Sequence, residues 1–143
     1  MRAALRNPGR RRRASPVRCA RRERIVSTMN SEDPVASNPE HYRVLFENEH
    51  VRVLDYTDTP GTRTTPHSHP NSVMVTLSDF DRRLHTPAGS RDVTLTAAHA
   101  MWLPAQRHAG ENIGSTPTHV IFIELKGAGA GSPAERSVGP VTP

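Results

Sequence analysis

The chain has 143 residues, of which 34% are hydrophobic, and a formal net charge of +5 at pH 7. This length fits one domain, and no apolar run is long enough to cross a bilayer, so we do not expect contact with a membrane. The single cysteine, Cys19, excludes an internal disulfide and a cysteine-based zinc cluster. A reducing compartment is therefore favoured, and we expect a cytoplasmic protein.

The positive charge belongs to the start of the chain. Residues 1–28 contain ten arginines and one glutamate, whereas residues 29–143 contain nine basic and 13 acidic residues. The basic segment could bind nucleic acid, could be a transit peptide, or could lie upstream of a true start at Met29. It has no apolar stretch for a secretory signal and no aromatic residue to stack on bases. We favour the start at Met29 and do not expect nucleic-acid binding by the rest of the chain.

Two segments of biased composition flank a central domain. Residues 1–40 are rich in Arg, Pro, Ser and Asn without a hydrophobic period, which predicts a disordered extension. Residues 127–143 are rich in Gly, Pro and Ser, which predicts a second disordered segment. The folded domain is expected over residues 41–126.

This domain alternates apolar and polar residues over short stretches, a pattern typical of β-strands. Turn residues separate the stretches, for example at Pro60-Gly61 and Pro87-Ala88-Gly89. In chain order, strands are expected at 42–46, 51–56, 72–77, 82–86, 93–96, 100–103, 108–113 and 118–125. Apart from one turn near residues 38–42, no window has a helical period. The sequence therefore predicts an all-β sandwich or barrel.

Three histidines make up the most informative pattern. His67 and His69 are two residues apart, so both side chains point to one face if the segment is extended. His108 follows after further strands and could approach them from a neighbouring strand. Imidazole is a common ligand of transition metals, and three such ligands leave positions free for water or substrate. The alternative is that some of the eight histidines of the chain are simply solvated.

Around these histidines the sequence resembles the cupin superfamily. Gly61 to His69 fits the motif Gly-x5-His-x-His, and Pro104 to Asn112 resembles the second motif, a proline followed by His-x3-Asn. The resemblance covers residues 42–126 and is closest to small bacterial single-domain cupins, some of which are labelled as β-alanine degradation proteins. It implies a double-stranded β-helix, also called a jelly-roll barrel, with a metal ion inside. It also implies that His67, His69 and His108 are the metal ligands.

The chain departs from the cupin motifs at two places. The positions at which the first motif has a glutamate are Val73 and Met74, so the fourth ligand is missing. In the second motif Gln106 replaces a glycine, and the spacing to His108 is one residue shorter. We place Val73 on the same strand face as His67 and His69, where an apolar wall would replace the carboxylate.

Three neutral imidazoles leave a divalent ion with its full charge, which favours an anionic, oxygen-rich substrate. The resemblance adds that acetylacetone dioxygenase-like and cysteine dioxygenase-like cupins hold Fe(II) with three histidines. The best hypothesis is a metal-dependent, dioxygenase-type oxidation of a small organic acid or diketone-like molecule, with Fe(II) as the first choice of metal and Ni, Zn or Mn as alternatives. The alternative hypothesis is a non-catalytic or isomerase-like cupin that binds a small acid or sugar.

Two further polar residues are candidates for catalysis. Gln106 is expected near the barrel mouth, where it could reach a bound water or substrate. Glu111 lies three residues after His108, which places it on the opposite strand face. If the strand bulges, Glu111 could face the site and serve as a general base. For both residues the alternative is a purely structural or solvated role.

The small size of the domain also bears on its assembly. About 85 residues bury a limited apolar area, and exposed strands need to be covered. We therefore expect a homodimer, as the resemblance also implies. Trp102 is expected in the core or against the second copy.

Overall fold

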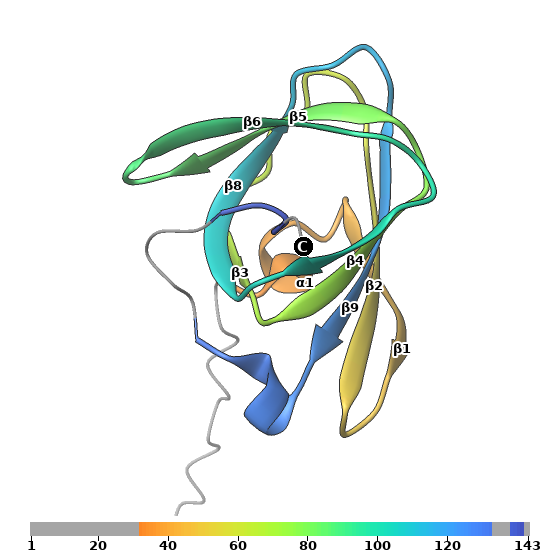
Figure 1. Cartoon of the computed structure of the whole chain (residues 1–143), viewed down its shortest axis with the longest axis vertical. Coiled ribbons are helices and arrows are strands. Elements are labelled where there is room, and N and C mark those ends of the chain that lie inside the picture. Colours follow the sequence, from red (N-terminus) through yellow and green to blue (C-terminus); the bar gives the residue numbers. More distant parts are fainter. Residues whose placement is uncertain (1–31, 133–137, 142–143) are drawn as a thin grey trace, which may run out of the picture.

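A computed structural model of the chain describes residues 32–132 and 138–141. Within these residues the fold consists of strands, with one short α-helix and one 3-10 helix (Figure 1). The strands are β1 (Tyr42–Glu47), β2 (Val51–Asp58), β3 (His67–His69), β4 (Ser72–Thr76), β5 (Phe80–Thr86), β6 (Gly89–Leu95), β7 (Ala100–Leu103), β8 (Gln106–Asn112) and β9 (Thr118–Leu125). Among the described residues, no helix has the length and apolar character needed to cross a membrane.

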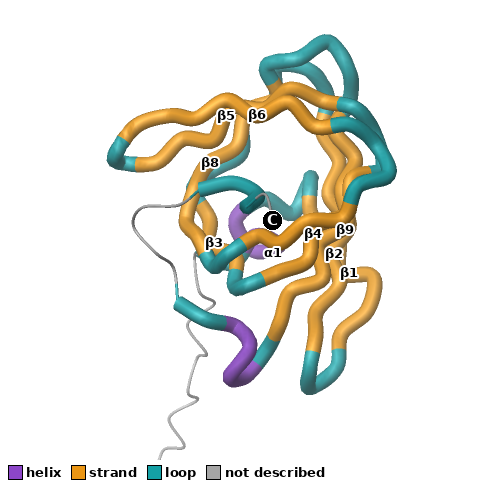
Figure 2. The backbone as a smooth tube through the Cα atoms, in the orientation of Figure 1, coloured by secondary structure: helices purple, strands orange, loops and turns teal. Residues whose placement is uncertain are grey.

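The strands form two antiparallel sheets that curve around a common interior (Figure 2). One sheet has the order β1-β2-β9-β4-β7 and the other the order β3-β8-β5-β6. This arrangement is an all-β jelly-roll barrel, as the sequence predicts. Residues of β4 and β9 alternate strictly between buried and partly buried, which places every second side chain inside the barrel. The buried apolar core consists of Tyr42, Leu54, Tyr56, Met74, Phe80, Leu103, Val120 and Phe122.

The folded part begins before residue 41. Helix α1 (Pro34–Ser37) starts at Asp33, whose carboxylate accepts hydrogen bonds from the backbone N–H groups of Val35 and Ala36. Asn38 follows the helix, is fully buried and accepts a 2.7 Å hydrogen bond from the backbone N–H of Thr65. Residues 32–40 thus belong to the fold. The sequence pattern did not indicate this, because a helix of four residues is too short to produce a helical period. The remainder of the predicted extension, including Met29, lies outside the described residues.

Part of the predicted C-terminal disordered segment also packs on the barrel. The 3-10 helix η1 (Gly127–Ala130) follows β9 directly. Further along, the N–H of Val141 donates to the carbonyl of Trp102, and the N–H of Gly139 donates to the side chain of Gln106. Residues 138–141 therefore lie across one end of the barrel, and residues 133–137 and 142–143 lie outside the described part of the chain.

Candidate metal centre

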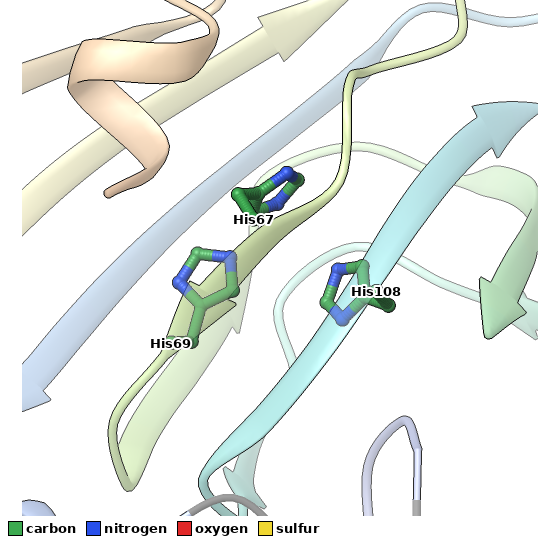
Figure 3. Close-up of side chains that lie close together, drawn as sticks. All are labelled: His67, His69 and His108. Atoms are coloured by element: carbon green, nitrogen blue, oxygen red, sulfur yellow. The ribbon is translucent and has the colours of Figure 1, made fainter. Parts of the chain in front are cut away.

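The three histidines of the sequence pattern meet inside the barrel (Figure 3). His67 and His69 lie on β3, and His108 lies directly opposite His67 on β8 in the antiparallel register. One ring nitrogen from each residue lies within 4.8 Å of those of the other two, and all three side chains are buried. Pairing of the two motif strands thus brings together residues that are about 40 positions apart in the chain.

Hydrogen bonds orient two of the imidazoles toward this shared space. Nδ1 of His67 lies 2.7 Å from the carbonyl oxygen of Thr65, and Nδ1 of His69 lies 2.7 Å from a carboxylate oxygen of Glu124. Both partners can only accept, so each Nδ1 carries the proton and donates it. Nε2 is then the ring nitrogen of each residue that is left to bind a metal ion, the arrangement found around metal-ligating histidines.

His108 differs from the other two histidines. Its Nδ1 is buried and is the single buried side-chain polar atom without a hydrogen-bond partner among the described residues. An unpaired buried nitrogen costs free energy unless a ligand or water satisfies it. The orphaned nitrogen of His108 fits a site built for a metal ion.

Burial keeps His67 and His108 neutral. Loss of hydration in the barrel, with the nearby His69 as a second cause, lowers the pKa of His67 from 6.5 to about 3. The same two causes, with His67 as a third, lower the pKa of His108 well below its ordinary value. A neutral imidazole has a lone pair to offer, so both residues can bind a metal ion at neutral pH without first losing a proton.

These pKa shifts predict how the metal-free protein responds to acid. Between pH 6.5 and about 3 the unfolded chain binds a proton at His67 that the folded chain does not. Stability should therefore decrease as the pH falls through this range, and moving from pH 7 to pH 5 should cost about 2 kcal/mol for this residue alone. Urea unfolding of the metal-free protein at both pH values measures the difference. The stability of the variant His67→Gln should depend less on pH than that of the wild type. An equal dependence would contradict the assignment of this effect to His67.

A chain of charged groups supports His69 from behind. The second carboxylate oxygen of Glu124 lies 2.8 Å from Arg52, which also forms an ion pair with Asp33 at 2.7 Å. Glu124 is almost fully buried, so these partners satisfy a charge that would otherwise be costly. The sequence analysis missed this residue. The available signal was an acid in phase with the core residues Val120 and Phe122 of the last strand.

The two candidate catalytic residues lie in different places. Gln106 is buried next to the site, opposite His69 in the strand register. Its amide nitrogen donates to the carbonyl of Pro104, and its amide oxygen accepts from Gly139. Glu111 lies on the outer face of β8, where it pairs with His85 at 2.7 Å. The structure thus brings Gln106 to the histidines but does not bring Glu111 there, because β8 continues without a bulge and keeps their parity opposite.

The prediction for Val73 was wrong. Strand β3 ends at His69, and the chain crosses to the other sheet before β4, so the inside-outside alternation restarts. Val73 is only partly buried, whereas Met74 is buried and lines the interior cavity. The apolar side chain that stands in place of the motif glutamate is therefore Met74.

The interior cavity beside His108 is mostly apolar and contains one buried cation. Arg82 donates from one nitrogen to Asp58 at 2.6 Å and from another to the hydroxyl of Tyr56 at 2.7 Å. Gly110 packs directly against this guanidinium, since a Cβ there would lie 2.3 Å from its Nη2. The cavity is closed on one side by Gly139 and is lined by Tyr42, Tyr56, Met74, Phe80, Arg82, Leu84, Val93, Leu95, Leu103, Gln106, His108, Thr118, Phe122, Gly139 and Pro140.

Comparison with solved structures assigns the family. A cupin domain from Bordetella pertussis Tohama I is 30% identical to this chain, with a TM-score of 0.57, and the match covers 60% of this chain and 92% of that one. The chain belongs to the cupin superfamily. A double-stranded β-helix protein from Klebsiella pneumoniae, 22% identical over 62% of this cupin and 77% of its own chain, has the same fold with a TM-score of 0.50.

Two other comparisons gave no match. No family model matches the sequence of this cupin. No curated protein matches it either. The assignment therefore depends on the solved structures, and the three buried histidines fit the metal-binding site of a cupin.

Proposed function

We propose that this cupin holds one divalent metal ion on His67, His69 and His108, with Fe(II) as the first choice of metal. We further propose that it catalyses a dioxygenase-type oxidation of a small organic acid or diketone-like substrate. The observation that carries the proposal is the set of three buried imidazoles with neighbouring ring nitrogens, two of them with their Nδ1 protons already committed to Thr65 and Glu124. When bound, the ion would supply the redox chemistry with dioxygen.

The residues around the histidines favour a compact, partly apolar anion as the substrate. Among the described residues, the cluster of possible metal ligands contains no carboxylate, so the positive charge of the ion remains available to an anion. The buried side chains of Met74, Phe80 and Phe122 make the lining of the adjoining cavity apolar. A small enolate, carboxylate or 2-oxo acid combines the charge and the apolar surface that such a site accepts. Membership of the β-alanine-degradation subgroup and a cytoplasmic location remain parts of this proposal.

Metal analysis and oxygen uptake test the proposal. The full chain is purified without oxygen and without a chelating tag, and its metal content is measured. We expect close to one iron per chain and oxygen consumption with at least one member of a panel of β-dicarbonyls, thiol-carboxylic acids and 2-oxo acids. Uptake should disappear in His67→Ala. A folded protein that binds no metal under any loading condition would refute the proposal.

The second candidate is a cupin that binds a small acid or sugar without oxidising it, or that isomerises it. This alternative is favoured by the end of the barrel where Gly139 and Pro140 line the cavity. There the backbone N–H of Gly139 donates to the side-chain oxygen of Gln106. A metal-loaded protein that consumes no oxygen across the panel, but whose melting temperature rises with a small acid or sugar, would favour this function.

We also keep the homodimer as a proposal. Strand β1 is at the edge of its sheet, and its side chains Leu45 and Phe46 are about half exposed. Trp102, expected in the core or against a partner, is 42% exposed at the edge strand β7. A second copy that continues the sheet at β1 would cover its unpaired backbone groups.

Light scattering tests this proposal. The wild-type protein should have the mass of a dimer, and Leu45→Glu should shift it to a monomer because a charge on the covered edge is costly to bury. His50→Ala, a change at an exposed turn beside β1, is the control and should remain a dimer. A wild-type monomer at high concentration would contradict the proposal.

A further inference from the structure

Tyr42 is held firmly inside the barrel. It begins β1, which is separated from the end of α1 by four residues, its backbone N–H donates to the carbonyl of Asn38, and its side chain is 3% exposed. Its ring packs against Tyr56, with ring centres 4.6 Å apart, and more loosely against Phe122 at 6.1 Å. These contacts fix the direction of the ring, and its hydroxyl group points to the histidines.

The hydroxyl of Tyr42 meets both imidazoles of β3. Its oxygen lies 3.0 Å from Nε2 of His67 and 3.3 Å from Nε2 of His69. Each Nδ1 donates to a partner that can only accept, which leaves the two Nε2 atoms for the hydroxyl. One hydroxyl has one proton and can satisfy only one of them. One oxygen and two nitrogens, all of them atoms that can bind a metal ion, therefore lie next to one another.

The spacing of these three atoms is that of ligands around one metal ion. With metal–ligand bonds of about 2.1 Å, neighbouring ligands lie about 3.0 Å apart in an octahedral shell and about 3.4 Å apart in a tetrahedral one. The two measured distances fall in this interval. A cation at the centre would satisfy all three lone pairs, which the single proton of Tyr42 cannot do.

We propose that Tyr42 is a fourth protein ligand of the metal ion, binding through its oxygen. This inference rests on the proposed function, because it requires the ion on the three histidines. The phenolate oxygen replaces the carboxylate that the motif would supply near Met74, and the hydroxyl proton leaves to solvent as the ion binds. The phenolate also halves the positive charge left on a divalent ion. Three histidines and one phenolate leave two positions open on an octahedral ion, which suit one small monoanionic substrate.

Ferric iron is the probe for this ligand. A phenolate bound to Fe(III) gives a visible absorption band and enhanced tyrosine vibrations in the resonance Raman spectrum. The full chain is loaded with Fe(II) without oxygen and then oxidised. Because the chain contains only two tyrosines, Tyr42 and Tyr56, such a band has only two possible sources. Tyr56 donates to Asp58 and accepts from Arg82, so it is the matched control.

The expected results test the Tyr42 ligand and the three-histidine metal site independently. Wild type and Tyr56→Phe should show the band, whereas Tyr42→Phe should lose it while still binding iron through the histidines. Iron bound without the band in wild type, or a band that persists in Tyr42→Phe, would overturn the ligand assignment and leave the metal site intact. Wild type that binds no iron would overturn the proposed function and the assignment with it.

Discussion

Replacing His67 with alanine should abolish stoichiometric metal binding. His67 is fully buried, its Nδ1 is held by Thr65, and its Nε2 faces the shared space of the cluster. Loss of a supporting partner alone typically weakens a metal site by about 10- to 100-fold, and removal of a ligand itself should cost more. Elemental analysis after dialysis measures the metal content, and a metal titration measures the affinity.

The control for this experiment is His50→Ala. His50 is exposed and its ring pairs with the exposed Glu49, so its removal should leave metal content unchanged. A third variant, Glu124→Gln, should retain the metal with reduced affinity, because the amide still contacts Nδ1 of His69 but lacks the charge. If His67→Ala bound metal as tightly as wild type, the ion would have to be held elsewhere.

Replacing Asp58 with alanine should destabilise the protein by about 3–5 kcal/mol, since it leaves a buried cation without its partner. Asp58 accepts hydrogen bonds from Arg82 and Tyr56 through one oxygen and from Asn112 through the other. Arg82 is 7% exposed and cannot reach water without opening the barrel. Urea unfolding at pH 7 measures the loss.

A double variant separates the unpaired charge from loss of packing. Asp58→Ala with Arg82→Met removes both charges and keeps an unbranched side chain beside Gly110, so it should recover much of the stability lost in the single variant. Equal destabilisation of the single and double variants would mean that the packing around Asp58, and not the charge of Arg82, carries the effect.

The same pair makes the protein sensitive to strong acid. Although burial opposes it, hydrogen bonds from Tyr56 and the charge of Arg82 hold the pKa of Asp58 below its ordinary value of 3.8. A carboxylate with a lowered pKa contributes stability above its unfolded pKa, and this contribution is lost as the pH falls through the folded one. Arg82 then remains charged and buried beside a neutral acid, so stability should decrease further as the pH falls below 3.8, and urea unfolding over this acid range measures the decrease.

Much of the fold could be predicted from local sequence. The expected strands 42–46, 100–103 and 118–125 correspond to β1, β7 and β9 within a residue at each end. Alternation of apolar and polar residues is a property of the strand itself, so it is visible without knowledge of its partners. Helix α1 and the packed residues 138–141 left no such pattern, because each is too short to repeat and is held by contacts with distant strands.

The metal centre divides in the same way. His67 and His69 share a face because neighbouring residues on one strand alternate, and the cupin motif adds His108. The alternation could not be carried past Pro70 to Val73, since the chain changes sheets there. Tyr42 and Glu124 lie 25 and 55 residues from the histidines that they contact, and nothing in their immediate sequence indicates those contacts.

The sequence by itself therefore determined the class of fold, most of the strands and the three histidines, all of which follow from short-range periodicity and a spaced motif. Only the tertiary structure decided which groups surround those histidines. Closing two sheets into a barrel brings β1 and β9 against β3, and this places the hydroxyl of Tyr42 and the carboxylate of Glu124 on opposite sides of His69. Such contacts depend on strand order and on which side chains face inward, and neither is a local property of the chain.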